Sequence, residues 1–334
     1  MSPKVSIILM TYNQVDYVEE ALKSVFQQTY QNWELIISDN GSTDGTDSVL
    51  ETYKDHEKVT LILNRSNDYV TRRANEALEM VSGEYISILY GDDYYLPTKI
   101  EEQIECFKGL SSEWGVVHGP GFSLNQKNDQ QSLENCLEVH GNALQEILDH
   151  FYTKGFINPI SPLARKSCYD LYPFYKDLFT EGESIYMRFS IKFKFFYLEN
   201  PLVVMRVHDK NARWYSKKNL EVQDTCLERL KDSSDFPSRL LNNLTRLRTY
   251  NYSIGAWENL RLSENIDVKY IRERIFKSFK LDSLGSLSLR NILALILSYC
   301  PNIMVITFNK SLDYVFNVSK QNYLDESFIN NDRN

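Results

Sequence analysis

The stretch that decides the fold is Tyr85–Asp93, which reads Tyr-Ile-Ser-Ile-Leu-Tyr-Gly-Asp-Asp. Its first part is a largely apolar, β-branched run, as expected of a strand buried on both faces of a sheet. Gly91 then lets the backbone turn, and two adjacent carboxylates, Asp92 and Asp93, follow. Pro97 opens a helix a few residues later. The stretch therefore predicts a strand, an acidic loop and a helix in succession.

The same succession recurs along the first 120 residues and continues, less regularly, to about residue 207. The hydrophobic periodicity predicts strands at Val5–Leu9, Trp33–Ser38, Val59–Leu63, Tyr85–Leu89, 115–118, 195–198 and 202–207. It predicts helices at 15–26, 46–54, 71–81, from 97 onward, at 142–152 and at 185–193. This alternation predicts an α/β fold with an open, mainly parallel sheet and helices on both of its faces.

Beyond Val207 the sequence becomes charged and nearly free of Gly and Pro, which predicts several helices between residues 217 and 280. We expect an α/β domain at 1–211, a helical C-terminal region at 212–324 and a disordered polar tail at 325–334. The most apolar segment, 291–308, is interrupted by Ser, Pro and Asn and falls short of the ~20 apolar residues that a membrane-spanning helix needs. A buried helix and a segment lying on a membrane surface both remain open.

Composition and missing motifs exclude several classes of function. With 43% apolar and 25% charged residues the chain has the make-up of a globular protein, and its net charge of −8 argues against general nucleic-acid binding. Five scattered cysteines predict neither a disulfide framework nor a zinc site and fit a reducing cytoplasm, and the first apolar run is too short for a signal peptide. There is no phosphate loop, GxGxxG, HExxH or GxSxG, which disfavours kinases, dehydrogenases, metalloproteases and hydrolases.

Three polar loops follow predicted strands, at Thr11–Gln14, Asp39–Thr46 and Tyr90–Asp93. Because parallel sheets bind ligands outside the carboxyl ends of their strands, we expect these loops to converge on one site. Asp92 and Asp93 could hold Mg²⁺ or Mn²⁺ together with diphosphate oxygens, or simply cap the next helix. Asp39 could accept a hydrogen bond from a nucleobase or ribose, or be a turn-forming residue.

Other candidate residues lie further along the chain. Arg72 and Arg73 could reach a phosphate or belong to a solvated helix face. Glu181 and Glu183 precede a helical run, where either could deprotonate an acceptor hydroxyl or cap the helix. His208 follows Arg206 at a strand end, where it could be a ligand or a structural residue.

Three segments of this chain, in their order and spacing, resemble glycosyltransferase family 2, a family of inverting enzymes with the GT-A fold. They are Val-Ser-Ile-Ile-Leu-Met-Thr-Tyr-Asn at 5–13, Ile-Ile-Ser-Asp-Asn-Gly-Ser-Thr-Asp-Gly-Thr at 36–46 and Gly-Glu-Tyr-Ile-Ser-Ile-Leu-Tyr-Gly-Asp-Asp-Tyr-Tyr-Leu-Pro at 83–97. The resemblance covers residues 3–120 and extends more weakly to about 211 through Pro201–His208, which looks like the family's segment ending in Tyr-Arg-x-His.

The resemblance implies a nucleotide-sugar donor, UDP-linked or another, and bound Mn²⁺ or Mg²⁺. The resemblance implies that Thr11 and Tyr12 line the nucleotide pocket and that Asp39 binds the base. Together with the residues singled out above, the expected donor pocket comprises Thr11, Tyr12, Asn13, Asp39, Arg72, Arg73, Gly91 and Asp92. Asp92 matches the last acid of the family's metal-binding Asp-x-Asp, whose first acid is replaced here by Tyr90. Metal binding would then rest on Asp92, aided by Asp93 and His208.

The family's base is an Asp in a Glu-Asp pair, and this sequence departs from that pattern. Counting back from Arg188 without gaps places Glu181 at the Glu and Gly182 at the Asp. Glu183 is then the nearest substitute and our preferred base, whereas a shift by one residue would make Glu181 the base.

The function that the resemblance implies is transfer of a sugar to a hydroxyl of a glycan or lipid-linked glycan, by a metal-assisted single displacement, as in bacterial polysaccharide synthesis. A catalytically weak or inactive nucleotide-sugar-binding relative, acting as an assembly subunit, is the alternative. A nucleotidyltransferase would need a Gly-rich basic loop after the first strand, which Thr11–Gln14 is not. We expect a cytoplasmic protein, with peripheral contact to the inner face of the membrane or homodimerisation through the C-terminal helices.

Overall fold

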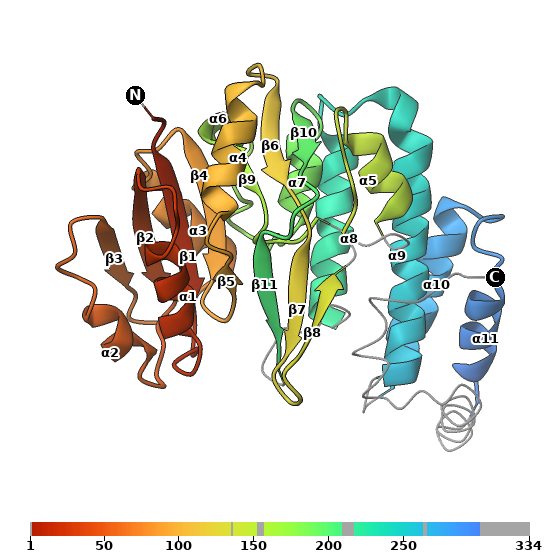
Figure 1. Ribbon diagram of the computed structural model, residues 1–334. Coiled ribbons are helices and arrows are strands. Elements are labelled where there is room, and N and C mark those ends of the chain that lie inside the picture. Colours follow the sequence, from red (N-terminus) through yellow and green to blue (C-terminus); the bar gives the residue numbers. More distant parts are fainter. Residues whose placement is uncertain (1, 135, 152–156, 209–216, 263–265, 301–334) are drawn as a thin grey trace. The chain divides into compact units, whose positions relative to one another are not determined.

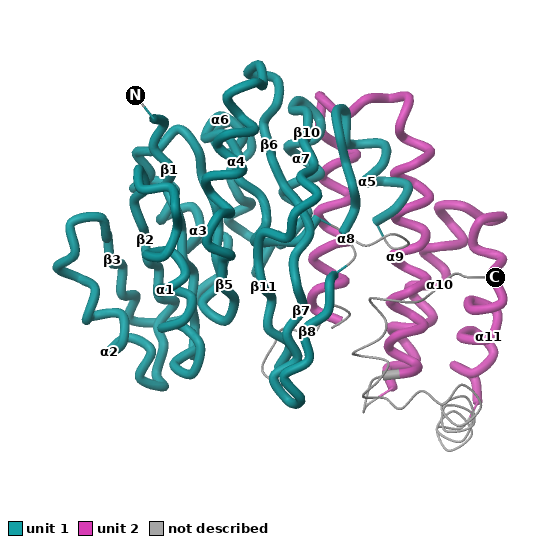
Figure 2. The backbone as a smooth tube through the Cα atoms, in the orientation of Figure 1, with its two compact units in different colours: residues 1–211 teal, residues 212–334 magenta. Residues whose placement is uncertain are grey.

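The computed structural model describes residues 2–134, 136–151, 157–208, 217–262 and 266–300. The chain divides into two compact units, residues 1–211 and 212–334, which Figure 2 shows in different colours. The expected tail at 325–334 and the second half of the apolar segment 291–308 lie outside the described residues.

Seven strands of the first unit form one sheet, in the order β10-β6-β9-β4-β1-β2-β3 (Figure 1). Neighbouring strands in it are parallel, except that β9 runs antiparallel to both β4 and β6. The bounds are β1 Val5–Thr11, β2 Trp33–Asp39, β3 Val59–Leu63, β4 Tyr85–Tyr90, β6 Trp114–His118, β9 Leu163–Arg165 and β10 Lys194–Tyr197. The predicted α/β fold with a mainly parallel sheet is confirmed.

Helices pack on both faces of this sheet. The core on one face joins Ile7 and Leu9 of β1 to Leu22 of α1 and Ile104 of α4. On the other face α3 packs against β1 and β2, because alternate strand residues such as Ile8 point to that side. The helices of this unit are α1 Val18–Phe26, α2 Thr46–Glu51, α3 Val70–Glu79, α4 Lys99–Lys108, α5 Leu144–His150, α6 Lys166–Leu171 and α7 Ser184–Phe189.

A second, four-stranded sheet lies in the same unit, in the order β5-β11-β7-β8. Its strands are β5 Tyr94–Tyr95, β7 Gly121–Asn125, β8 Gln130–Glu134 and β11 Val203–Val207. β11 pairs antiparallel with β5, and β5 begins directly after the acidic turn that ends β4. This pairing brings the end of β11 to the loop that carries Asp92 and Asp93.

The second unit is helical among its described residues, as the sequence predicts. Its elements are α8 Lys217–Asp232, a short 3₁₀ helix at Ser238–Leu240, α9 Leu241–Leu262, α10 Val268–Leu281 and α11 Leu289–Leu297. The long helix α9 packs against α8, α10 and α11. Its small apolar core consists of Ala256, Leu260, Ile271, Ile275 and Ala294. No helix in the described part of the chain has both the length and the hydropathy to traverse a bilayer.

Candidate active site at the strand ends

The loops after β1 and β2 are bound to each other by hydrogen bonds. The backbone N–H of Asn13 donates to Ser42 Oγ over 2.8 Å, and Asn13 Oδ1 accepts from the N–H of Thr43, also over 2.8 Å. The N–H of Gln14 donates to Thr46 Oγ1 over 2.9 Å. Asn13 adopts a φ of 52°, a left-handed conformation that its short polar side chain tolerates. The structure therefore brings these two sequence-predicted loops together.

Two predicted nucleotide-binding residues of these loops differ in their surroundings. The ring of Tyr12 is 44% exposed and presents a face on which a base could stack. Asp39 is buried, and its Oδ2 accepts the backbone N–H groups of Gly41 and Ser42 over 3.1 and 2.9 Å. Asp39 thus makes the turn-forming contacts expected of an Asx residue, which also fix the position of its carboxylate.

Gly91 brings the third loop against the first. Its N–H donates to the carbonyl of Met10 over 2.9 Å. A Cβ at this position would lie only 2.6 Å from both Thr11 Oγ1 and Gln14 Oε1, so any side chain would push the loops apart. The three loops therefore lie together at the carboxyl ends of β1, β2 and β4, where a parallel sheet binds its ligands.

Asp92 and His208 meet at this edge. Asp92 Oδ2 lies 3.3 Å from His208 Nε2, and the two side chains are 13% and 7% exposed. The His208 ring stacks on Tyr17, with ring centroids 4.6 Å apart and an interplanar angle of 16°. The stacking restrains the plane of the imidazole, whose Nε2 lies beside the Asp92 carboxylate.

Arg206 holds the acidic turn on β11. Its backbone N–H donates to Asp93 Oδ1 over 2.9 Å, and its guanidinium donates to the carbonyl of Asp92 over 2.5 Å and pairs with Glu20. Burial, followed by the charge of Asp92, raises the pKa of Asp93 well above its usual range, and Arg206 offsets part of that rise. One oxygen of Asp93 is therefore engaged in joining the turn to β11.

The residues at this edge fit a divalent cation. Two ligands that subtend a right angle at one octahedral ion, with bonds of about 2.1 Å, lie about 3 Å apart, close to the Asp92–His208 separation. The carboxylate oxygen of Asp92 is a ligand that suits Mn²⁺ and Mg²⁺, and the imidazole nitrogen of His208 is a ligand that transition-metal ions accept. Within the described residues no three His, Cys, Asp or Glu side chains gather as a ligand group. Such a site depends on water and on substrate oxygens for its remaining ligands, as Mg²⁺ sites with phosphates do.

The two candidate bases have different environments. Glu181 is fully enclosed: its Oε1 pairs with Arg188 over 2.7 Å, and its Oε2 accepts the N–H of Tyr175 over 3.0 Å. Glu181 thereby ties the preceding loop to α7. Gly182, which matches the family's Asp, has a φ of 50°, and a Cβ there would meet nothing within 4 Å.

Glu183 is partly buried just before α7. Burial, with a smaller contribution from the nearby carboxylate of Glu134, raises its pKa to about 8. Burial raises the pKa of Tyr90, and the negative charges of Glu183, Asp93 and Asp92 add to that rise. Glu183 therefore lies within electrostatic range of the acidic turn, with a pKa near that of an effective base at neutral pH.

Glu134 is a partly buried acid that the sequence did not reveal. It ends β8, and its Oε2 accepts from Asn158 Nδ2 over 3.3 Å. Burial raises its pKa to about 7. The strand Gln-Gln-Ser-Leu-Glu has no alternating apolar pattern, so the only available signal was the Asn128-Asp129 turn, where Asp129 has a φ of 52°.

The two predicted phosphate-binding arginines are engaged with protein groups. Arg72 donates to the carbonyl of Lys176 over 2.8 Å and pairs with Asp68 over 3.1 Å. Arg73 pairs with Glu76 over 2.8 Å and donates to Asn40 Oδ1 over 3.2 Å. Arg73 thus lies beside the loop that carries Asp39, whereas Arg72 braces the loop before Glu181. A role on phosphate remains a prediction for both.

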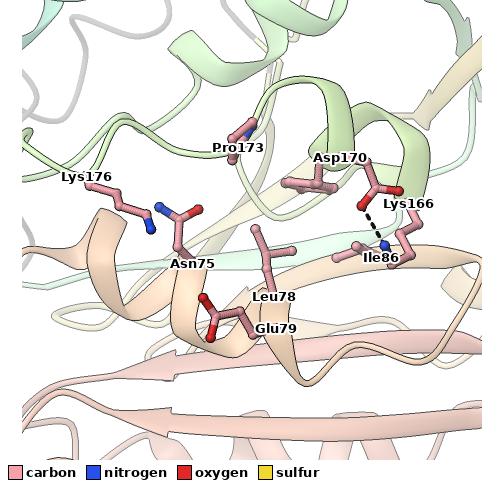
Figure 3. Close-up of a pocket in the computed structure, with 9 residues that line it drawn as sticks. Asn75, Leu78, Glu79, Ile86, Lys166, Asp170, Pro173 and Lys176 are labelled. Carbon is pink, nitrogen blue, oxygen red and sulfur yellow. Dashed lines mark hydrogen bonds and ion pairs between the residues drawn. The ribbon is translucent and has the colours of Figure 1, made fainter.

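A separate cavity of about 280 Å³, drawn in Figure 3, is lined by residues that belong to none of these loops. Ile86, near the start of β4, lines it, as do Asn75 and Glu79 of α3 and the Lys166–Asp170 ion pair of 2.5 Å. It contains none of the predicted site residues. Since ligands of such sheets bind at the carboxyl ends of the strands, the candidate active site is the loop cluster and not this cavity.

Comparison with known proteins identifies the part of the chain that contains these loops. The family model "Glycosyl transferase family 2" matches residues 6–164, which include the three strand-end loops. The putative teichuronic acid biosynthesis glycosyltransferase TuaG of Bacillus subtilis is 38% identical over 123 residues, covering 36% of this chain. The chain spans about half of that relative, 48% of its length.

Two solved structures share the fold. The S. aureus TarS fragment 1–349 in complex with UDP-GlcNAc superposes with a TM-score of 0.65 at 14% identity, over 89% of each chain. The mannosyltransferase PcManGT from Pyrobaculum calidifontis, in complex with GDP-Man and Mn²⁺, gives a TM-score of 0.58 at 16% identity, over 98% of this chain and 88% of the other. The strand-end loops lie inside the matched segment, so residues 6–164 form a domain of glycosyltransferase family 2.

Proposed function

We propose that the protein transfers a sugar from a nucleotide-sugar donor to a hydroxyl of a glycan or lipid-linked glycan, with inversion at the anomeric carbon. The observation that carries this proposal is the convergence of Asp92 and His208, 3.3 Å apart, beside the joined loops at the ends of β1 and β2. Support comes from the family match of residues 6–164 and from structural neighbours solved in complex with UDP-GlcNAc and with GDP-Man. The name of TuaG makes a cell-surface polysaccharide the favoured product.

In this proposal the donor lies across the three strand-end loops. Tyr12 stacks on the base with its exposed ring, and Asp39, fixed by its turn, accepts a hydrogen bond from the base or ribose. Thr11 and Asn13 line the same pocket, and Gly91 lets the diphosphate approach the backbone. UDP is the favoured nucleotide.

Asp92 and His208 hold a divalent cation, Mn²⁺ or Mg²⁺, in this proposal, with Asp93 close by. When bound, the cation neutralises the charge that develops on the leaving diphosphate. Arg206 keeps Asp92 in place through its carbonyl, and Tyr17 keeps His208 in place through ring stacking. A structural neighbour was crystallised with Mn²⁺ as well as GDP-Man.

Glu183 is the proposed base. Its carboxylate takes the proton of the acceptor hydroxyl while the hydroxyl oxygen bonds to the anomeric carbon from the face opposite the diphosphate. The bond between that carbon and the diphosphate oxygen breaks, and the diphosphate leaves with the electron pair. A single displacement of this kind needs one base and inverts the configuration, unlike the two-carboxylate mechanism of a retaining glycosidase. We place Glu181 in a supporting role, because both of its oxygens are occupied.

A second candidate function rests on Gly182. Since the family's base is expected at this position, the chain could bind nucleotide sugars as an assembly subunit and turn them over weakly or not at all. Donor binding would be common to both functions. Only turnover separates them.

A panel of nucleotide sugars with Mn²⁺ or Mg²⁺, scored by thermal shift, tests the proposal, because a ligand that binds the folded state raises the unfolding temperature. We expect one nucleotide family to stabilise the protein, and only when metal is present. Transfer from that donor to glycan acceptors then decides between the two functions. Stabilisation without turnover on any acceptor would favour the binding subunit.

A further inference from the structure

The helix α11 exposes several large apolar side chains on its outer side, where an ordinary amphipathic helix carries polar residues. Its inner side carries the fully buried Asn291 and Ala294, with Ser298 just beyond the helix, and Leu295 and Leu297 pack partly buried against the core. Its outward side carries Leu289, Ile292, Ile296 and, one turn on, Tyr299, which are 73, 41, 56 and 65% exposed. These four positions recur at the three- and four-residue spacing of one helix face. We call them the outer stripe.

Hydrogen bonds fix α11 in this rotation. Asn291 Nδ2 donates to Ser253 Oγ of α9 over 2.8 Å and to the carbonyl of Ser286 over 3.0 Å. At the other end, Arg272 Nε of α10 donates to Ser298 Oγ over 3.2 Å. Rotating α11 so that the outer stripe faced inward would break these hydrogen bonds. Any of these polar groups that stayed buried would then lack a partner. The exposure of the stripe is therefore a built feature of the second unit.

Further apolar side chains are exposed next to the outer stripe along the chain. Leu284 and Leu287, in the turn between α10 and α11, are 81 and 60% exposed, and Phe276 of α10 is 56% exposed. Single exposed apolar residues are ordinary on protein surfaces, but a run of this size within one helical hairpin indicates an interaction surface.

The charge of the same hairpin is opposite to that of the chain as a whole. Residues 268–300 contain six Lys or Arg and two acids, a net charge of +4 in a chain with a net charge of −8. Lys269, Lys277 and Lys280 are exposed on α10. Exposed apolar residues combined with Lys and Arg are the pattern of helices that lie in the headgroup region of an anionic membrane.

We propose that the α10–α11 hairpin docks on an anionic lipid bilayer, with the outer stripe and Leu284 and Leu287 entering the headgroup region and the lysines contacting lipid phosphates. The charge argues against pairing of the same surface with a second copy, because the exposed Lys269, Lys277 and Lys280 of the two copies would repel each other. Docking of this kind would deliver the protein to lipid-linked acceptors. The surface itself is independent of the proposed transfer reaction.

Vesicle flotation of the full chain tests the proposal and needs neither donor nor metal. We expect the protein to float with phosphatidylcholine vesicles that contain about 30% phosphatidylglycerol, and to float about tenfold less with pure phosphatidylcholine. Ile292→Asp/Ile296→Asp should reduce flotation by about tenfold, because the aspartates remove apolar area and add repulsive charge. Lys277→Glu/Lys280→Glu should abolish the preference for anionic vesicles.

The matched control is Met80→Asp/Leu171→Asp, which alters two exposed apolar residues of the first unit, 55 and 50% exposed. It should float like the wild type, and thermal unfolding of all variants should show that each is folded. Three outcomes would overturn the proposal: no flotation of the wild type, unchanged flotation of the folded Ile292→Asp/Ile296→Asp variant, or a wild-type dimer in sedimentation that this variant dissociates. The last would assign the stripe to a second copy.

Discussion

Asp92 Oδ2 lies 3.3 Å from His208 Nε2, although Asp92 follows a strand of the seven-stranded sheet and His208 follows a strand of the four-stranded sheet. The pairing of β5 with β11 and the bond from the Arg206 N–H to Asp93 create this approach. The two sheets thus meet at the proposed metal site, and the loops after β1 and β2 adjoin it through Gly91.

Gly91→Ala should weaken nucleotide-sugar binding and destabilise the fold. The added methyl group would lie 2.6 Å from Thr11 Oγ1 and Gln14 Oε1, so the first loop must move away from the third. Forced overpacking of this kind costs about 1–3 kcal/mol of unfolding free energy, and we expect roughly a tenfold loss of donor affinity by calorimetry. Gly109→Ala is the control, since its Cβ meets nothing closer than 3.9 Å. Equal donor affinities in the two variants would contradict the role of this contact.

Glu183→Gln and Glu181→Gln should fail in different ways. Losing a general base typically lowers kcat by about 10²–10⁴, so Glu183→Gln should bind donor normally and turn over poorly. Glu181→Gln breaks a buried ion pair with Arg188, which typically costs about 3–5 kcal/mol of stability, so its unfolding temperature should fall. Chemical denaturation and single-turnover transfer separate the two effects. A stable, inactive Glu181→Gln beside an active Glu183→Gln would exchange the two roles.

The rate of transfer should rise with pH up to about 8. Glu183 must be deprotonated to act as a base, and its pKa is raised from 4.5 to about 8. The stability of the fold should instead decrease as the pH rises. A carboxyl group whose pKa is higher in the folded state than in the unfolded state stabilises the fold at pH values below its unfolded-state pKa. That contribution is lost as the pH rises through its folded-state pKa. Unfolding free energies measured between pH 4.5 and 8 should therefore fall less steeply in Glu183→Gln than in the wild type.

Glu134→Gln should move the pH dependence of kcat to lower pH. The carboxylate of Glu134 adds to the rise in the pKa of Glu183, so its removal should let Glu183 deprotonate earlier. Comparing kcat profiles at saturating acceptor distinguishes this effect from weaker acceptor binding, which would appear in KM. If the acidic side of the kcat–pH profile is the same in Glu134→Gln as in the wild type, the carboxyl groups of Glu134 and Glu183 do not interact during catalysis.

The parallel strands were predictable because buried strands have a distinctive pattern. Val59–Leu63 was predicted with its observed bounds, and β1, β2 and β4 each extend only one or two residues beyond the prediction. The strand-end loops could be located for the same reason, since each begins where an apolar run stops. The apolar pattern alone therefore predicts that Thr11, Asp39 and Asp92 lie at one edge of the sheet.

Short and polar elements escaped prediction because they owe their structure to their neighbours. β9 has three residues and β5 has two, and both are strands only because they pair with longer ones. The hairpin of β7 and β8 carries few buried apolar residues, so Glu134 had no pattern around it. The contact of Asp92 with His208 likewise depends on the second sheet, which periodicity does not reveal.

The orientation of α11 was also beyond the sequence. An apolar helix is ordinarily expected to bury its large residues, and both burial and a membrane surface were open for 291–308. In the described part, the bonds of Asn291 to Ser253 and Ser286 hold that side of α11 inward and leave the outer stripe exposed.

The most direct test of the account is calorimetric binding of the preferred nucleotide sugar with and without Mn²⁺, in the wild type, Asp92→Ala and His208→Ala. His150→Ala and Asp170→Ala are controls of the same residue types outside the site. We predict that wild-type binding needs the metal and weakens by about tenfold or more in both site variants, with the controls unchanged. Equal affinity without metal, or metal-dependent binding that survives in both site variants, would contradict the proposed site.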